Sequence, residues 1–430
     1  MTQSRTPAAP RARRAQAEAA LHDRYSTVRA ASMALSQPLS AEDCALQSMP
    51  DASPVKWHLA HTTWFFETFV LVPHAAGYQV FDSSFRMLFN SYYNAVGDKH
   101  PRPERGFLSR PDLATVHRYR AHVDAALQRF LSRAPASDVA ALIELGLHHE
   151  QQHQELIVTD SKHLLSRNPT RPAYLPRWPL RAVQPLPLRW IPHQGGIVDV
   201  GHAGETFGFD NETPRHRVLL EPFALASRPV THGEFAEFIA DGAYRRPELW
   251  LSLGWDRVQA ERWQAPLYWE WRDGAWWTFT LHGMAEIDPH TPVCHLSYFE
   301  ADAFARWRDA RLPTEFEWEA IATRVPLEGH FADSRVFHPL PASDAGTAAA
   351  PVQMFGDVWE WTSSSYAPYP RFRPAAGAVG EYNGKFMCNQ YVLRGGSCAT
   401  PAGHVRATYR NFFPPEARWQ FSGLRLARDA

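Results

Sequence analysis

The sequence predicts an α+β protein of two domains, a helical bundle followed by an irregular domain of short strands and short helices. The chain has 430 residues, of which 45% are hydrophobic and 21% are charged. It is therefore too long for one ordinary core and too apolar for disorder. Apolar residues recur at helical spacings of three and four in the first half, whereas the second half is rich in aromatic residues. Thirteen of the sixteen tryptophans lie at or after position 190.

Residues 1–18 are predicted to form a flexible amino terminus. This segment is rich in Arg, Ala and Pro and superficially resembles a transit peptide, but it has no apolar core region. The most apolar early stretch, Trp64 to Val72, is short and carries Glu67, so it cannot span the roughly 20 residues of hydrocarbon that a membrane helix needs. We therefore expect a soluble protein that does not associate with membranes.

Residues 19–168 are predicted to form the helical bundle. The segments "HRYRAHVDAALQRFL" and "DVAALIELGLHHEQQHQELIVTDSKHLL" carry the clearest helical spacing. The second of them should begin near Ser137 and Asp138, which are suitable N-cap residues, and should end at "SRNPTRP", where a run of prolines starts.

Residues 169–192 are predicted to be a linker, because their seven prolines remove backbone donors and favour extended conformations. Tyr174, Trp178 and Trp190 are apolar enough to pack and to keep this linker ordered. Residues 193–430 then form the α+β domain. In it, "HRVLLEPFALA", "HTPVCHLS" and "QYVLRGGS" are predicted strands, and "THGEFAEFIAD", "YFEADAFARWRDA" and "TEFEWEAIAT" are predicted helices.

Charge and cysteine content exclude several classes of function. The 44 basic residues balance 45 acidic ones, so no long-range field would hold a nucleic acid or an anionic membrane. The cysteines form no C-x-x-C pair, which argues against a structural zinc site and favours a reducing cytoplasm. They are Cys44, Cys294, Cys388 and Cys398. The sequence carries no indication of the oligomeric state.

The most informative segment is "LHHEQQHQEL", which lies inside the second strong helical pattern. His149 and His153 are four residues apart, so they differ by only about 40° around a helix axis. Both imidazoles therefore project from one face, as two ligands of one divalent metal must. A polar helix face with ordinary hydrogen-bonded histidines is the alternative, and the neighbouring His148, Glu150 and Glu155 favour the metal site.

Two metal chemistries fit this segment. "HEQQH" matches the H-E-x-x-H pattern of zinc peptidases, in which the Glu is the general base, although no downstream third ligand is evident. Alternatively, the third ligand comes from "KWHLAHTTWFFE", where His58 and His61 lie on another helical segment. Three histidines from two helices would leave open positions for an oxygen-activating Fe(II) centre.

Several motifs in order along the chain resemble one family. "WHLAHTTWFFE", "FNSYYNAVG", "HPRPERG" and "HHEQQHQEL" resemble the ergothioneine-biosynthetic sulfoxide synthases, which are iron enzymes with a DinB-like helical domain. In the second half, "DNETPRHRVLL", "RLPTEFEWE", "GDVWEWT" and "LRGGS" resemble the formylglycine-generating-enzyme-like fold. "RNFFPPEARWQFSGLRLA" resembles the end of that domain in the same synthases. The selenoneine synthases share both domains.

The resemblance implies a non-heme Fe(II)- and O2-dependent synthase that joins a chalcogen donor to C2 of the imidazole of hercynine, the trimethylbetaine of histidine. It implies that His61, His149 and His153 bind the iron, with His58 and His148 as neighbours rather than ligands. The helical domain then supplies the metal ligands and the proton donor, and the second domain supplies the acceptor pocket.

The resemblance also implies residues that hold hercynine. Gln152 matches the family position that hydrogen-bonds the imidazole, and Asn411 matches the position that holds the carboxylate or ammonium end. A quaternary ammonium cannot donate an N–H hydrogen bond, so aromatic faces receive it best. Phe412, Phe413 and Trp419 are the candidates for this contact.

A proton donor is also needed, because the reduction of O2 takes up protons, and a Tyr hydroxyl in a dry pocket can supply one. Tyr92 and Tyr93 match the paired tyrosines of one branch of the family, whereas core or loop packing is the alternative reading of two adjacent tyrosines.

The donor remains open between two classes. Arg102 and Arg105 resemble the clamp for a donor carboxylate, although solvated surface arginines would look the same. Another branch has Trp and Asp at the positions of Phe412 and Phe413, and that Asp helps to hold γ-glutamylcysteine. Its absence here favours a smaller thiol such as cysteine, and it fits equally well a selenosugar, the donor of the selenoneine synthases.

Two readings lie outside this family. A formylglycine-generating oxidase would need two cysteines five positions apart after "GGS", but Cys398 is followed at that distance by Gly403. Cys398 is therefore predicted to be a small buried residue. A non-catalytic, aromatic-rich binding module would leave the histidines unexplained.

Overall fold

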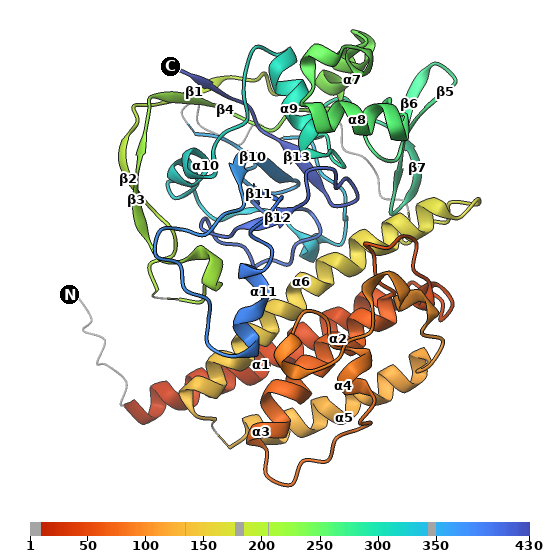
Figure 1. The fold of residues 1–430 in the computed structure, drawn as a ribbon, viewed down its shortest axis with the longest axis vertical. Coiled ribbons are helices and arrows are strands. Elements are labelled where there is room, and N and C mark those ends of the chain that lie inside the picture. Colours follow the sequence, from red (N-terminus) through yellow and green to blue (C-terminus); the bar gives the residue numbers. More distant parts are fainter. Residues whose placement is uncertain (1–9, 134, 177–184, 205, 343–349) are drawn as a thin grey trace, which may run out of the picture. The chain divides into compact units, whose positions relative to one another are not determined.

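The computed structural model describes residues 10–133, 135–176, 185–204, 206–342 and 350–430. They fall into two compact units, Met1–Asp160 and Ser161–Ala430 (Figure 1). The first unit is helical and the second combines helices with five small sheets, so the predicted α+β class is confirmed.

The first unit is built from helices. They are α1 (Pro10–Ser36), α2 (Val55–Phe66), α3 (Val72–His74), α4 (Phe85–Leu88), α5 (Leu113–Leu131) and α6 (Ser137–Arg167), whose last turns belong to the second unit. Helices α5 and α6 confirm the two segments predicted from apolar spacing, and α6 begins at the predicted residue. The segment predicted to be flexible lies partly outside the described residues, and α1 begins within it.

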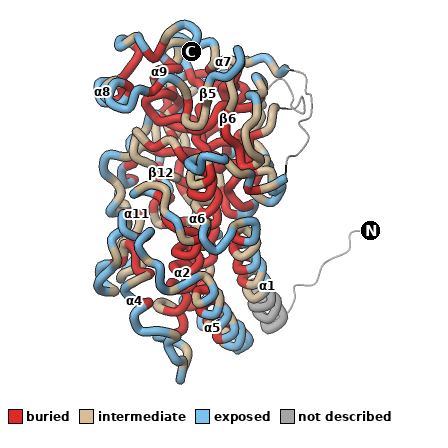
Figure 2. The backbone as a smooth tube through the Cα atoms, turned by 90° about the vertical axis from the view of Figure 1, so that its right-hand side faces the viewer, coloured by how far each residue is buried: buried red, intermediate tan, exposed pale blue. Residues whose placement is uncertain are grey.

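Helix α2 is buried along its whole length (Figure 2). It packs against α5 and α1, and a π-helical segment, Glu67–Leu71, continues it. Helix α5 is capped by Asp112, whose side chain accepts the backbone N–H of Thr115. Because α2 is surrounded by protein, every polar side chain on it must find a partner inside the unit.

The second unit has short helices and strands. Its helices are α7 (His232–Ala240), α8 (Ser252–Glu261), α9 (Tyr298–Trp307), α10 (Glu315–Ala322) and α11 (Glu381–Gly384). Its strands are β1 (Trp190–His193), β2 (Gly196–Val200), β3 (His216–Leu220), β4 (Phe223–Ala226), β5 (Trp269–Arg272), β6 (Ala275–Thr280), β7 (Gly283–Glu286), β8 (Gly329–His330), β9 (Phe355–Gly356), β10 (Trp359–Ser365), β11 (Tyr391–Arg394), β12 (Asn411–Phe413), β13 (Ser422–Leu424) and β14 (Ala427–Asp429).

The central sheet has the order β12-β11-β10-β13, with β10 and β13 parallel and the other pairs antiparallel. A second sheet, β1-β4-β14, joins the two ends of the unit. The hairpin β2-β3 and the sheet β5-β6-β7 project on opposite sides of the central sheet (Figure 1). The core contains Trp318, Phe355 and Leu225, all buried.

Three helices of the second unit begin with the same N-terminal capping motif. Thr231, Ser297 and Thr314 each accept the backbone N–H of a Glu three residues later, and that Glu accepts the N–H of the capping residue in return. This capping box satisfies two donors that the first turn of a helix leaves free. The three helices confirm the predicted helical segments α7, α9 and α10.

One predicted strand is wrong. The segment "HTPVCHLS" forms only an isolated bridge between Pro292 and Thr231. Pro292 has no N–H to donate, and His295 has a φ of 66°, which takes the chain out of the extended region. The segment therefore cannot continue a ladder, although it lies beside neighbouring chain segments.

The predicted linker is ordered where it is described. Tyr174 is buried, and its backbone N–H donates to the carbonyl of Leu281. Trp190 begins β1 and lies under the guanidinium of Arg428. Trp178 lies outside the described residues. No helix within the described ranges combines the length and the apolar character that a membrane crossing requires.

Candidate metal centre

Helices α2 and α6 bring three histidines together in the first unit. His61 projects from α2, and His149 and His153 project from α6. One ring nitrogen from each lies within 4.8 Å of the others, and the Nε2 atoms of His61 and His149 are 3.2 Å apart. His61 and His149 are buried and His153 is half-buried. The helical spacing of four therefore places two imidazoles beside a third from another helix, as one metal ion would require.

His61 is held on both faces and on one edge. Its ring is stacked between the indoles of Trp57 and Trp64, at centroid distances of 4.6 and 5.6 Å. Its Nδ1 lies 2.6 Å from the carbonyl oxygen of Phe89, so Nδ1 carries the proton and donates it. Nε2 of His61 is then left with a free lone pair that faces His149.

The three imidazoles are uncharged at neutral pH. Burial lowers the pKa of His149 to about 4. Burial, followed by the neighbouring imidazole of His149, lowers the pKa of His61 and that of His153 well below the ordinary value. A neutral imidazole offers a lone pair, so the group is prepared to bind a divalent cation.

Glu150 lies on another side of α6 and takes no part in this group. Its two carboxylate oxygens accept from Arg29 at 2.8 Å, Arg120 at 2.9 Å and the hydroxyl of Ser32 at 2.6 Å. All four side chains are buried, and the two guanidinium groups hold the pKa of Glu150 at about 2 despite its burial. A peptidase general base must reach the metal-bound water, so the geometry does not support the H-E-x-x-H reading.

His148 is also turned away from the three histidines, since its Nε2 lies 2.6 Å from the guanidinium of Arg24. His58 instead contacts His153, with 2.8 Å between their Nδ1 atoms. Neither residue belongs to the group of three. That both are neighbours rather than ligands stays a prediction.

The two candidate tyrosines lie in different surroundings. Tyr92 is half-buried, and its hydroxyl accepts from the guanidinium of Arg102 at 3.0 Å. Tyr93 is buried and packs against Trp64 and Phe69, with ring centroids 5.6 and 5.2 Å away. Trp64 also stacks on His61, so the Tyr93 ring is one indole away from a candidate ligand.

The two candidate clamp arginines also differ. Arg102 reaches Tyr92 and the backbone carbonyl of Asp51. Arg105 is buried, lies 3.3 Å above the ring of Trp57 and donates to the hydroxyls of Ser53 and Ser91. It forms no ion pair with any residue in the described ranges, and burial lowers its pKa to about 9. Arg105 is therefore not the solvated surface arginine that the sequence left open.

Gln152 directly precedes His153 on α6 and is half-buried. The remaining candidates belong to the second unit. Asn411 begins β12, and its Oδ1 accepts the backbone N–H of Phe412 at 2.9 Å. Phe413 pairs with Tyr391 of β11 and contacts Trp419 edge-on at 5.6 Å.

Phe412 does not join this aromatic group. Successive strand residues point to opposite faces, and the ring of Phe412 stacks on Tyr366 at 4.1 Å and on Phe386 at 5.7 Å. The structure therefore brings Phe413 and Trp419 together and separates Phe412 from them. Cys398 is fully buried, as predicted.

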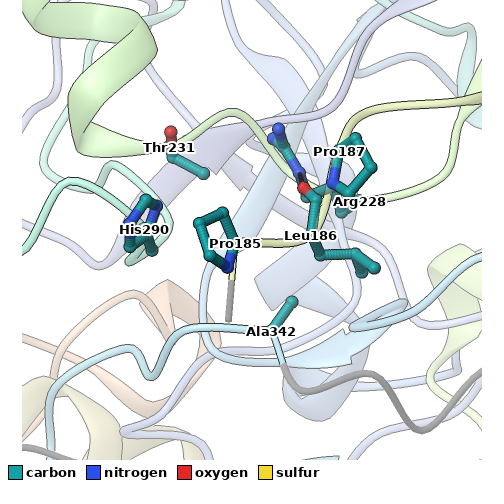
Figure 3. A pocket seen from close by; sticks show the side chains of 7 residues that line it. All are labelled: Pro185, Leu186, Pro187, Arg228, Thr231, His290 and Ala342. Atoms are coloured by element: carbon teal, nitrogen blue, oxygen red, sulfur yellow. Dashed lines mark hydrogen bonds between the residues drawn. The ribbon is translucent and has the colours of Figure 1, made fainter. Parts of the chain in front are cut away.

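A separate cavity in the second unit is lined by prolines 185 and 187 together with Arg228, Thr231 and His290 (Figure 3). Arg228 already forms a two-pronged ion pair with Glu234, and the hydroxyl of Thr231 caps α7. His290 is thus the one titratable side chain among the described lining residues that is not engaged in such a structural contact. This cavity offers no group of reactive side chains comparable to the three histidines.

Known proteins match both units. Residues 24–157 match the family model of the DinB superfamily. Residues 189–350 and 336–430 match the model of the sulfatase-modifying factor enzyme 1-like domain. A hercynine oxygenase of Mycolicibacterium thermoresistibile is 33% identical over 409 residues, which are 88% of this chain and 88% of that protein. The chain belongs to the hercynine oxygenase family.

Members of this family are enzymes, and so is this chain. The hercynine oxygenase of Mycobacterium tuberculosis is 32% identical over 419 residues, which cover 90% of this chain and 94% of that protein. Ergothioneine biosynthesis protein 1 of Schizosaccharomyces pombe is 28% identical over 236 residues, which cover 52% of this chain and 28% of that protein. The predicted family, with its two domains, is confirmed.

Sequence reasoning missed two features of the site. Asp160 is connected to the histidine group by His58: its Oδ2 lies 3.1 Å from Nε2 of His58, and His58 contacts His153. Its position seven residues after His153 places it on the same face of α6, so the spacing could have indicated it. The stacking of Trp57 and Trp64 on His61 was also missed, although Trp57 lies four residues before His61 and Trp64 three residues after it, which puts all three on one side of α2.

Proposed function

We propose that this chain is a non-heme Fe(II)- and O2-dependent synthase that forms a bond between a chalcogen donor and C2 of the hercynine imidazole. The observation that carries this proposal is the group of three neutral imidazoles, His61, His149 and His153, in a chain of the hercynine oxygenase family. The matching fission-yeast protein, named for ergothioneine biosynthesis, supports the same pathway.

The donor set suits iron. Three imidazole nitrogens leave other coordination positions open, as an oxygen-activating Fe(II) centre needs. In His61 the ring proton is on Nδ1, which donates it to the carbonyl of Phe89. Nε2 is therefore unprotonated, and its lone pair can bind a metal. When bound, Fe(II) would supply the activation of O2 and the positions at which donor and oxygen meet.

With a thiol donor the reaction balances without a further reductant. The thiol loses one hydrogen, C2 of the imidazole loses another, and both leave with one oxygen atom as water. The second oxygen atom stays on sulfur as a sulfoxide. O2 is therefore the oxidant for both the C–S bond and the S–O bond.

Tyr93 is our proposed proton donor. The hydroxyl of Tyr92 already accepts from Arg102 and its side chain is half-exposed. Tyr93 lies in an aromatic pocket with Trp64 and Phe69, where a proton can be delivered without competition from bulk water.

The acceptor is proposed to be held by Gln152 at its imidazole and by Asn411 at its amino-acid end. Phe413 and Trp419 form an edge-on pair that can receive the trimethylammonium group, each face contributing on the order of 0.5 to 2 kcal/mol. Phe412 is half-buried and its ring stacks on Tyr366, so we assign it a supporting role behind β12.

For the donor, Arg105 favours a carboxylate-bearing thiol such as cysteine. Its buried guanidinium donates only to hydroxyl groups in the described part of the chain, so a carboxylate would be its natural partner. Arg102, three residues before Arg105 on the same short 3-10 helix, Arg102–Phe107, would contribute the second half of the clamp. A selenosugar donor would leave Arg105 without an anion.

The test is anaerobic reconstitution with Fe(II), followed by O2, hercynine and, in parallel, cysteine, γ-glutamylcysteine or a selenosugar. Products are identified by mass spectrometry. A sulfoxide adduct with cysteine supports the proposal, and a selenium adduct formed only with the selenosugar moves the chain to the selenoneine branch. Absence of any adduct overturns the proposed function. In the same assay, Tyr93→Phe should slow product formation while iron binding is retained.

A further inference from the structure

His153 is linked to a buried carboxylate through a second histidine. Its Nδ1 lies 2.8 Å from Nδ1 of His58, and Nε2 of His58 lies 3.1 Å from Oδ2 of Asp160. His58 and Asp160 are 2% and 5% exposed, so water does not compete for these contacts. All three residues belong to the first unit.

The direction of each hydrogen bond follows from the acceptor at the end of the chain. Oδ2 of Asp160 also accepts the backbone N–H of Ser53 at 2.8 Å, so this oxygen acts as an acceptor. Nε2 of His58 must then donate, which leaves Nδ1 of a neutral His58 with a lone pair. Nδ1 of His153 donates to that lone pair. The nitrogen of His153 that remains free for a metal is therefore Nε2.

We propose that Asp160 and His58 are positioning residues that orient His153 and increase the electron density on its Nε2. This inference rests on the proposed metal site. A carboxylate that accepts from a ligand histidine fixes its tautomer and ring orientation and makes it a stronger ligand. Here the carboxylate acts through one additional imidazole.

The same contacts join the two helices that carry the ligands. His58 is three residues before His61 on α2, and Asp160 is seven residues after His153 on α6. The chain of hydrogen bonds therefore passes from α6 to α2 and returns to α6. This arrangement fixes the position of one ligand-bearing helix against the other, at a point one turn from His61.

The three histidines are consequently anchored in different ways. His61 donates to a backbone carbonyl, which no substitution of a side chain removes. His153 depends on two side chains. Nδ1 of His149 is buried and has no hydrogen-bond partner among the described residues. His153 is therefore the ligand whose geometry and basicity respond to mutation outside the group of three.

The experiment uses Co(II) as the metal probe in the full-length protein. The metal-free wild type and the variants Asp160→Asn and His58→Phe are titrated with Co(II), and the visible bands of the bound ion are recorded. Asn is isosteric with Asp and keeps an acceptor but loses the charge, while Phe removes both hydrogen bonds of His58. His148→Phe is the matched control, because His148 is a buried histidine beside the ligands that bonds to Arg24 instead.

We expect both variants to bind Co(II) about 10- to 100-fold more weakly than the wild type, with shifted visible bands. His148→Phe should keep the wild-type bands and an affinity within about threefold, since the ring of His148 bonds to Arg24 and His148 is not one of the three candidate ligands. A structural role alone would lower thermal stability without moving the bands of the bound ion. If His58→Phe fails to fold, the isosteric Asp160→Asn decides the question.

Wild-type affinity and wild-type bands in Asp160→Asn would overturn the proposed role of the carboxylate. Absence of Co(II) binding in the wild type would instead overturn the metal site on which the proposed function rests. The two failures are therefore separated by the wild-type titration.

Discussion

Two sides of helix α6 use buried polar groups in opposite ways. On one side, Glu150 is saturated, because Arg29, Arg120 and Ser32 donate to its two oxygens. On the other side, ring nitrogens of His149 and His153 lie within 4.8 Å of one from His61, in a group that could hold a metal ion. Residues 149 and 150 are neighbours in the sequence but differ by about 100° around the axis.

The comparison separates stability from function within one helix. The saturated side contributes to the folding free energy, because removal of any partner leaves a buried charge. The histidine side carries no such buried ion pair, so it contributes less to folding and is available for a ligand. Substitutions on the two sides should therefore affect different measurements.

The largest effect is expected from His153→Ala. It removes one of the three proposed metal ligands, so Fe(II) binding and product formation should both be lost. The free energy of unfolding of the metal-free protein should fall by about 1 to 3 kcal/mol, since the buried Nδ1 of His58 loses its donor. Metal analysis, the product assay and urea unfolding test this. Full turnover by a variant that contains no iron would contradict the assignment.

The next largest effect is expected from Glu150→Gln, which keeps the shape of the side chain and removes its charge. Arg120 would lose its only ion-pair partner in the described part of the chain, and Arg29 would keep only Asp124. Breaking a buried ion pair costs about 3 to 5 kcal/mol. Urea unfolding should show this loss even without metal. A stability equal to that of the wild type would mean that the saturated side is not structural.

The sequence predicted the two sides unequally. The spacing of His149 and His153 was sufficient to place both on one face, because helical geometry is local. The same geometry could have separated Glu150 from them, yet the H-E-x-x-H pattern made this residue a candidate general base. The choice of His61 over His58 as the third candidate ligand came from resemblance alone, since no periodicity indicates which helices pack together.

Longer-range features were beyond the sequence. The contact of His58 with Asp160 joins residues 102 positions apart and depends on the packing of α2 against α6. The separation of Phe412 from Phe413 was within reach, because a period of two puts adjacent residues on opposite faces. The "HTPVCHLS" segment was predicted as a strand from its apolar pattern, which does not indicate that His295 has a φ of 66°.

Acid should distinguish the two sides without any mutation. The pKa of His149 is lowered from 6.5 to about 4, so the unfolded chain takes up its proton first and stability falls as the pH drops from 6.5 to 4. This shift corresponds to about 3 kcal/mol. The pKa of Glu150 is lowered from 4.5 to about 2, so its contribution is kept above pH 4.5 and is lost only as the pH falls toward 2.

Between pH 7.5 and pH 4.5, only His149 of these two residues changes the free energy of unfolding with pH. Urea unfolding of the metal-free protein over this range therefore measures the histidine side. His149→Gln should flatten this part of the curve relative to the wild type, whereas Glu150→Gln should lower the whole curve without changing its slope there. An unchanged slope in His149→Gln would show that this imidazole is not held neutral by the fold.

The smallest effect is expected at a matched ion pair on the same two helices. Arg24 and Glu144 join α1 to α6 at 2.8 Å, as Arg29 and Glu150 do, but their side chains are 33% and 37% exposed. Water screens such a pair, so Glu144→Gln should cost less than about 1 kcal/mol and leave metal binding unchanged. Urea unfolding of Glu144→Gln and Glu150→Gln side by side gives the comparison. Equal losses would mean that burial is not what makes Glu150 important, and the contrast between the two sides of α6 would then need a different physical cause.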